Sequence, residues 1–195
     1  MRTNHTKWRV VLLATCAVAG LAIAGFSALG QMPPAQQPKA HLYTSPDLFF
    51  EVEIPAGWDY RNEEGSNEIL VLKGDVSVSV AVTPIEEGDP AQKFLDVNKK
   101  MLKQQCPSAE LRAEGTTKVA GVEGAYFSMF CPGPRLPTLV RISTAIQYGH
   151  FFVFNVTAPS EQWAAMQPVI DRMAQSFKAG EGLPEGREPR KRTPR

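Results

Sequence analysis

Side chains that commonly carry acid–base or nucleophilic chemistry are sparse in this sequence. Beyond the N-terminal segment it holds two histidines, His41 at the end of a Pro-rich spacer and His150 at a turn beside Gly149. Neither is spaced from a serine or cysteine in a recognisable motif. A Ser/His/Asp triad is defined by geometry and not by spacing, so a hydrolase stays as our third hypothesis. A plain turn residue is the favoured interpretation of His150.

Metal and cofactor motifs are also weak. The acidic runs Glu63-Glu64 and Glu86-Glu87, the latter with Asp89, could bind a hard cation such as Ca²⁺ through carboxylate oxygens. Their spacing matches no known binding loop, and solvated loop charge is the favoured interpretation. The sequence lacks a P-loop, a dinucleotide-binding turn and a zinc pattern. We therefore predict no catalytic residues, no metal, no cofactor and no enzymatic activity.

The cysteines favour a disulfide between Cys106 and Cys131. These are the only cysteines beyond the N-terminal segment, and each lies where a predicted helix or strand ends beside a proline. Disulfides persist in proteins that are exported from the cytoplasm. The alternative is a pair of buried free thiols.

The N-terminal segment predicts export. Three basic residues, Arg2, Lys7 and Arg9, precede an uncharged run at residues 10–29, the pattern of a signal peptide. We predict a signal peptide over residues 1–30, cut between Gly30 and Gln31, or an uncleaved membrane anchor formed by residues 10–29. Two lesser alternatives are a cut after Ala22-Ile23-Ala24 and a lipoprotein cysteine at Cys16. The exported body is then periplasmic or otherwise extracytoplasmic, either soluble or anchored.

Composition divides the rest of the chain into a spacer, a domain and a tail. Residues 31–40 form the Pro-rich spacer, residues 41–178 the domain, and residues 179–195 a basic tail that we expect to be disordered. Residues 31–178 hold 13 basic and 17 acidic residues, a net charge of −4, which offers no basic face for nucleic acid. The tail cluster Arg190, Lys191 and Arg192 could contact anionic lipid or remain solvated.

Hydrophobic periodicity predicts an antiparallel sheet flanked by helices, the α+β class. Alternation of period two predicts strands, and apolar residues at spacings of three and four predict helices. An N-cap at Asp89 begins the first helix and an N-cap at Ser160 begins the last. The expected strands are 50–54, 58–60, 68–73, 76–82, 111–119, 122–130, 138–147 and 151–158, and the expected helices are 91–105 and a closing helix after Ser160. The stripe expected on the first helix is Phe94, Val97, Met101 and Leu102, and that on the last is Trp163, Met166, Ile170, Met173 and Phe177.

Aromatic residues have a structural and a functional interpretation. Trp58 and Trp163, with Phe151, Phe152 and Phe154, are expected in the core. Phe151 and Phe152 are adjacent in a strand and must point to opposite faces, so both faces of the sheet should be covered. The alternative is an apolar pocket between sheet and helix that binds a lipid or a small ligand.

The strand and turn Phe50-x-Val52-x-Ile54-Pro55-x-Gly57-Trp58 resembles the opening of the PsbP-like superfamily, which includes PsbP, DcrB-type lipoproteins and Ran-binding Mog proteins. The resemblance extends over residues 43–178. It implies an α/β/α sandwich and a non-catalytic binding role, but no motif here matches the metal-binding residues of PsbP. We therefore expect an accessory protein that binds a protein partner at the membrane surface. The alternative is a carrier or sensor of a small apolar ligand.

Overall fold

The computed structural model describes residues 39–47, 49–62, 66–85, 91–133 and 136–180. These residues form two antiparallel sheets and two helices, which confirms the predicted α+β class. A small sheet has the order β1-β2-β10, with β1 at His41–Thr44, β2 at Phe50–Ile54 and β10 at Lys178–Ala179. A large sheet has the order β3-β4-β5-β9-β8-β7-β6, and its strands are β3 (Asp59–Asn62), β4 (Glu68–Lys73), β5 (Val76–Pro84), β6 (Glu110–Val119), β7 (Val122–Cys131), β8 (Thr138–Gln147) and β9 (His150–Pro159).

Alternating side chains explain why these segments are strands. In β5 the four valines at positions 76, 78, 80 and 82 share one face and are at most 4% exposed, as predicted. In β2 the residues Phe50, Val52 and Ile54 are fully buried, whereas Glu51 and Glu53 between them are not. Burial of one face fixes the register of each strand, because a slip of one residue would turn every apolar side chain outward.

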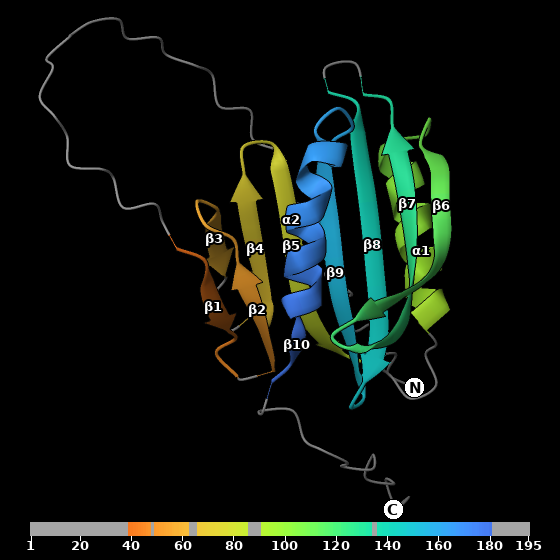
Figure 1. Ribbon diagram of the computed structural model, residues 1–195. Helices are drawn as coiled ribbons and strands as arrows, with labels where there is room; N and C mark the ends of the chain where they lie inside the picture. The colour runs from red at the N-terminus through yellow and green to blue at the C-terminus, as the bar shows by residue number, and fades with distance from the viewer. Residues whose placement is uncertain (1–38, 48, 63–65, 86–90, 134–135, 181–195) are drawn as a thin grey trace, which may run out of the picture. The chain divides into compact units, whose positions relative to one another are not determined.

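The helices lie on opposite faces of the large sheet (Figure 1). Helix α1 (Ala91–Gln105) packs on β7 and β8, and α2 (Trp163–Ser176) packs on β9 and on β2 of the small sheet. Phe151 lies in the core cluster under α1, and its neighbour Phe152 lies in the cluster under α2. Both faces of the sheet are therefore covered, as expected.

The structure corrects the prediction in four places. The strands form two sheets instead of one, and a strand that was not predicted, β1, begins at His41. On α1 the buried residue is Leu95, whereas Val97 is 48% exposed, so the buried stripe is rotated from the predicted one. Helix α2 begins at Trp163, and Gln162 precedes it without a side-chain cap, so Ser160 is not the N-cap.

Several predictions fall on residues outside the described part. These are the signal peptide or anchor with its cut between Gly30 and Gln31, the acidic runs at 63–64 and 86–89, and the tail cluster at 190–192. The strand β10 ends at Ala179, one residue beyond the predicted end of the domain. Among the described helices, neither α1 nor α2 has the length and apolar character needed to cross a membrane.

Candidate functional site

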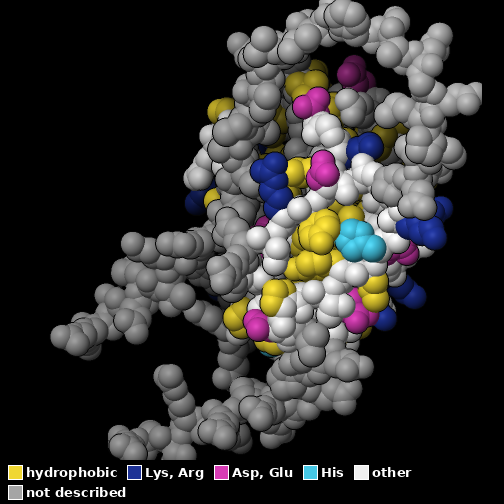
Figure 2. Space-filling model, turned by 90° about the vertical axis from the view of Figure 1, so that its left-hand side faces the viewer, with side chains coloured by type: hydrophobic (Ala, Val, Ile, Leu, Met, Phe, Trp, Pro, Cys, Tyr) yellow, Lys and Arg dark blue, Asp and Glu magenta, His cyan; other side chains and the backbone are white. Residues whose placement is uncertain are grey.

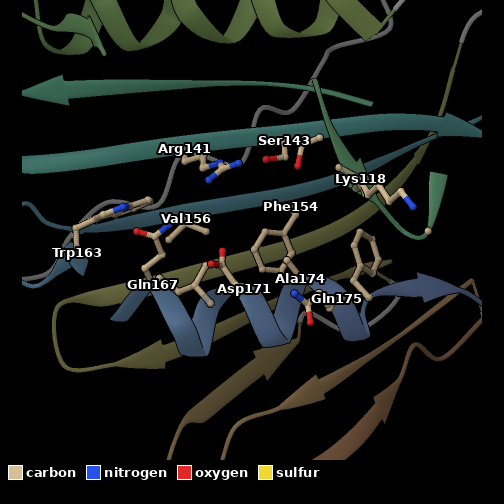
Figure 3. Close-up of a pocket in the computed structure, with 15 residues that line it drawn as sticks. Lys118, Arg141, Ser143, Phe154, Val156, Trp163, Gln167, Asp171, Ala174 and Gln175 are labelled. Atoms are coloured by element: carbon tan, nitrogen blue, oxygen red, sulfur yellow. The ribbon is translucent and has the colours of Figure 1, made fainter. Parts of the chain in front are cut away.

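A cleft of about 380 Å³ opens beside α2, and we call it the α2 cleft. Its floor is formed by β8 and β9, its wall by α2, and one end by the hairpin that joins β6 to β7. Figure 3 shows Arg141 and Ser143 on the floor, with Gln167 and Asp171 rising toward them from the helix. Trp163 lies at one end of the cleft and Lys118 at the other. The volume lies within the range of small-ligand sites, roughly 300–1,000 Å³.

The cleft has an apolar interior and a polar rim. Phe154, Val156 and Ile170 are buried residues of its lining and belong to the core cluster under α2. Lys118 and Asp171 are exposed, and neither forms an ion pair with another described residue. A ligand or a partner side chain can therefore meet unneutralised charge of either sign there.

The β6–β7 hairpin closes the cleft because it bends toward α2. Its two-residue turn uses Ala120 and Gly121, both at positive φ, as a type I′ turn requires. Val119 and Ala120 pack into the core cluster under α2. At the bend, a Cβ on Gly124 would lie 2.2 Å from the carbonyl oxygen of Thr144. Only glycine lets β7 approach β8 this closely.

Next to the cleft, part of the large sheet is covered by neither of the described helices on the side that faces α2. Residues that are paired across neighbouring strands lie on the same face of a sheet. The β9 residues that face α2 pair with residues of β8, and these pair in turn with residues of β7 on the same face. Figure 1 shows this area clear of α2. We call it the open sheet face, and its residues are Tyr126, Ser128, Phe130, Leu139, Arg141 and Ser143. The two serines are buried, and the other four side chains are partly exposed.

Two cation–π pairs lie on or beside the open sheet face. The guanidinium carbon of Arg141 is 4.2 Å from the centre of the Tyr126 ring, and that of Arg112 is 4.8 Å from the Phe130 ring. Arg112 also forms a 2.8 Å ion pair with Glu110. These contacts hold long side chains in place on the surface, which lowers the entropy lost when a partner binds.

The two histidines, neither of which is predicted to be catalytic, lie in separate surroundings. His150 has Nδ1 2.8 Å from the carbonyl oxygen of Tyr148, and its ring packs edge-on against Phe49. His41 packs against Tyr60 with ring centroids 5.1 Å apart, and Tyr43 also packs edge-on against Tyr60. Figure 2 shows the end of the molecule where β1 and β3 lie, with a histidine ring against an apolar patch. Burial raises the pKa of Tyr43.

None of these groups forms a metal-ligand set. Within the described ranges, no three His, Cys, Asp or Glu side chains come together as metal ligands would. Asn155 lies in mid-strand in β9, and its side-chain oxygen is buried. The candidate site therefore consists of a cleft and a neighbouring surface that carries aromatic rings and charged side chains.

The structure joins Cys106 to Cys131, with Cα atoms 6.2 Å apart. Cys106 directly follows α1, and Cys131 is the last residue of β7. The disulfide fixes the C-terminal end of α1 to the rim of the sheet that the helix covers, as the sequence predicted.

Sequence reasoning found part of the site and missed the rest. The sequence predicts Trp163 and Phe154 in the core, with a pocket between sheet and helix as the alternative, and both residues line the α2 cleft. Tyr126 and Arg141 were not singled out. Their signal is weak, since each is one residue within a long strand, and only the pairing of β7 with β8 brings them together.

Comparison with known proteins identifies the fold. The model of the PsbP family matches residues 39–179. Among curated protein sequences, none matches the chain.

Similar solved structures extend over most of the described domain. The cyanobacterial PsbP protein of Synechocystis is 18% identical with a TM-score of 0.52, and the match covers 77% of this chain and 98% of that one. LpqN of Mycobacterium tuberculosis, described as involved in cell envelope biogenesis, is 12% identical with a TM-score of 0.51, over 72% of this chain and 90% of that one. The Ran-binding protein Mog1p of Saccharomyces cerevisiae is 10% identical with a TM-score of 0.50, over 71% and 94%. At these identities the likeness is one of fold.

Proposed function

The chain belongs to the PsbP family, and from this premise we propose that it is an exported, non-catalytic accessory protein that binds a protein partner at the membrane surface. The binding site is the open sheet face together with the α2 cleft. The observation that carries the proposal is the set of aromatic and arginine side chains held on an uncovered part of the sheet.

Tyrosine, phenylalanine and arginine are enriched at protein interfaces and dominate their binding energy. Tyr126, Phe130 and Arg141 are each half-buried, so they already have supporting contacts while part of each side chain is free to meet a partner. The charged rim of the cleft, with Lys118 and Asp171, would fix the orientation of the partner.

Export is supported by the N-terminal sequence pattern and by the disulfide, which fits an oxidising compartment. A protein partner is in keeping with Mog1p, which is named for binding the protein Ran, although the partner here would be a different molecule.

The test is affinity capture from detergent-solubilised membranes with the full-length chain as bait. The wild-type chain is expected to capture a defined protein, and the Tyr126→Ala and Arg141→Glu variants are expected to lose it. Tyr148→Ala serves as a matched control, because Tyr148 is 40% exposed at a turn away from this face. Equal capture by all four chains would contradict the proposed surface.

A second candidate function is carriage of a small apolar ligand, which the volume and apolar interior of the α2 cleft favour. Native mass spectrometry of the purified chain distinguishes the two functions. The carrier function would be favoured by a retained lipid that the Phe154→Trp substitution displaces. In that case the substitution should leave the result of the capture experiment unchanged.

A further inference from the structure

The edge strand β6 is long and uncovered. Nine of its ten residues pair with β7 on one side, Arg112 being passed over at a register shift, and no described element lies on the other side. Residues 110–116 are all exposed. The opposite edge of the sheet, β3, has four residues, and the rings of His41 and Tyr43 from the small sheet lie against it at Tyr60.

The hairpin turn determines which backbone groups of β6 point outward. In a two-residue hairpin the residues that flank the turn, here Val119 and Val122, form a hydrogen-bonded pair, and such pairs alternate along the ladder. The N–H and C=O groups of Lys118, Thr116 and Glu114 therefore point away from β7. The register shift between Leu111 and Ala113 lies outside this segment and leaves it regular.

Charged residues on an edge strand usually prevent edge-to-edge pairing. Here the charges have opposite signs and lie symmetrically about Thr116, with Glu114 two residues before it and Lys118 two residues after it. In an antiparallel pair of two such strands centred on Thr116, each Glu114 lies opposite the Lys118 of the other copy. Threonine lies opposite threonine at the centre, which is also a favourable cross-strand pair.

We propose that β6 pairs with β6 of a second copy of this chain, forming a two-fold symmetric dimer with one continuous sheet. Such an interface is self-complementary, as closed dimers require. Lys99 of α1 binds one carboxylate oxygen of Glu114, and the other oxygen is free to accept from the second copy's lysine.

Neighbouring registers are worse. If one β6 strand is shifted by one residue relative to the other, backbone N–H and C=O groups that point away from β7 in one copy lie opposite residues of the other copy whose groups point toward its own β7. A shift of two in one direction brings Lys118 opposite Arg112 of the other copy, and in the other direction it brings Glu114 opposite the buried Ala120. The register centred on Thr116 is the one in which both the backbone and the charges match.

Charge reversal with rescue tests this register. Sedimentation equilibrium of the full-length chain in density-matched mild detergent should show a concentration-dependent dimer. Lys118→Glu and Glu114→Lys alone each place like charges opposite one another twice, and each is expected to raise the dimer dissociation constant at least tenfold. The double variant Glu114→Lys/Lys118→Glu restores unlike pairs and is expected to restore the dimer. Lys100→Glu, on α1, makes the same charge change away from the edge and should leave the constant unchanged.

Cross-linking tests the two-fold axis directly. In a Cys16→Ser background, Thr116→Cys is expected to give a covalent dimer with a short bis-maleimide, whereas Leu42→Cys on β1, which is also exposed, is not. A chain that stays monomeric at all concentrations would overturn the proposal. A dimer that neither single reversal weakens, or that the double variant fails to restore, would overturn it as well.

Discussion

The guanidinium of Arg141 lies over the ring of Tyr126, on neighbouring strands whose pairing places Arg141 opposite Ser128 and Tyr126 opposite Ser143. The two side chains are thus diagonal neighbours on one face, within reach of each other across the ladder. A double-mutant cycle with Arg141→Met and Tyr126→Leu is expected to give a coupling energy of about 0.5–1 kcal/mol, because both groups are half-exposed. The measurement is the free energy of unfolding in urea.

The control for this cycle is Arg172→Met, on the exposed side of α2. Arg172 lines a separate depression with Trp58 and Met173. Its coupling to Tyr126 should be close to zero. If the coupling energy between Arg172 and Tyr126 were as large as that between Arg141 and Tyr126, the coupling would come from the change in net charge and not from the cation–π contact.

Reduction of the disulfide should loosen α1 first. The helix buries only Leu95 completely, so without the cross-link to Cys131 it is held mainly by Leu95 and the partly buried Phe94 and Leu102. For a loop of 25 residues the chain-entropy model gives a loss of about 3.5 kcal/mol in the free energy of unfolding. Hydrogen exchange in α1 should rise more than in α2, and Cys106→Ser/Cys131→Ser should reproduce both effects. Two reactive thiols from these positions in denatured, unreduced protein would contradict the bond.

Gly124→Ala should destabilise the domain strongly. Its Cβ would press on the backbone of Thr144 and on the Cβ of Ala145, and neither can move without displacing β8. We expect a loss of about 2–3 kcal/mol in the free energy of unfolding, the range of overpacked sites. Gly115→Ala is the matched control in the neighbouring strand, because its Cβ would make only a 3.4 Å contact with the Tyr126 ring. That change should stay within about 0.5 kcal/mol.

Ser176 links the end of α2 to the small sheet, and its removal should be costly. Its hydroxyl accepts from the backbone N–H of Glu53 at 2.9 Å and donates to the carbonyl oxygen of Met173 at 2.7 Å. Ser176→Ala leaves a partly buried N–H without a partner, at a cost of about 1–2 kcal/mol. Ser160→Ala should cost less than about 0.5 kcal/mol, since Ser160 does not cap the helix. Thermal unfolding of the two variants checks the ordering.

The N-terminal prediction is tested by the mass of the intact protein from the producing cell. Cleavage between Gly30 and Gln31 should give a chain that begins at Gln31 and partitions away from the membrane fraction. A mass that includes Met1, found in membranes, would exclude cleavage and would identify residues 10–29 as an anchor.

The elements that could be predicted from sequence are those whose local pattern is strong. Alternation in β5 and the adjacent rings Phe151 and Phe152 were enough to predict strands covered on both faces. The strand β1 was missed because its four residues include only one partly buried ring, that of Tyr43. The strand β10 has two residues, too few to show any period.

The division into two sheets and the open sheet face could not be predicted from local pattern. Both depend on which strands pair, and β2 pairs with strands at either end of the domain. On α1, Phe94 and Leu102 do pack on the core as expected, but the neighbouring Leu95 takes the fully buried position. Helical spacing alone does not distinguish adjacent positions near the edge of an apolar stripe.

The pairing of β2 has a consequence for the time course of folding. Phe50, Val52 and Ile54 are made early, yet they are covered by α2 and β10, and Glu53 meets Ser176 across 123 residues of chain. Synthesis proceeds at about 5–20 residues per second, so several seconds pass between the synthesis of β2 and that of the elements that bury its apolar side chains. The strand β2 is therefore the apolar strand whose covering helix and pairing strand β10 are synthesised last, at the C-terminal end of the domain.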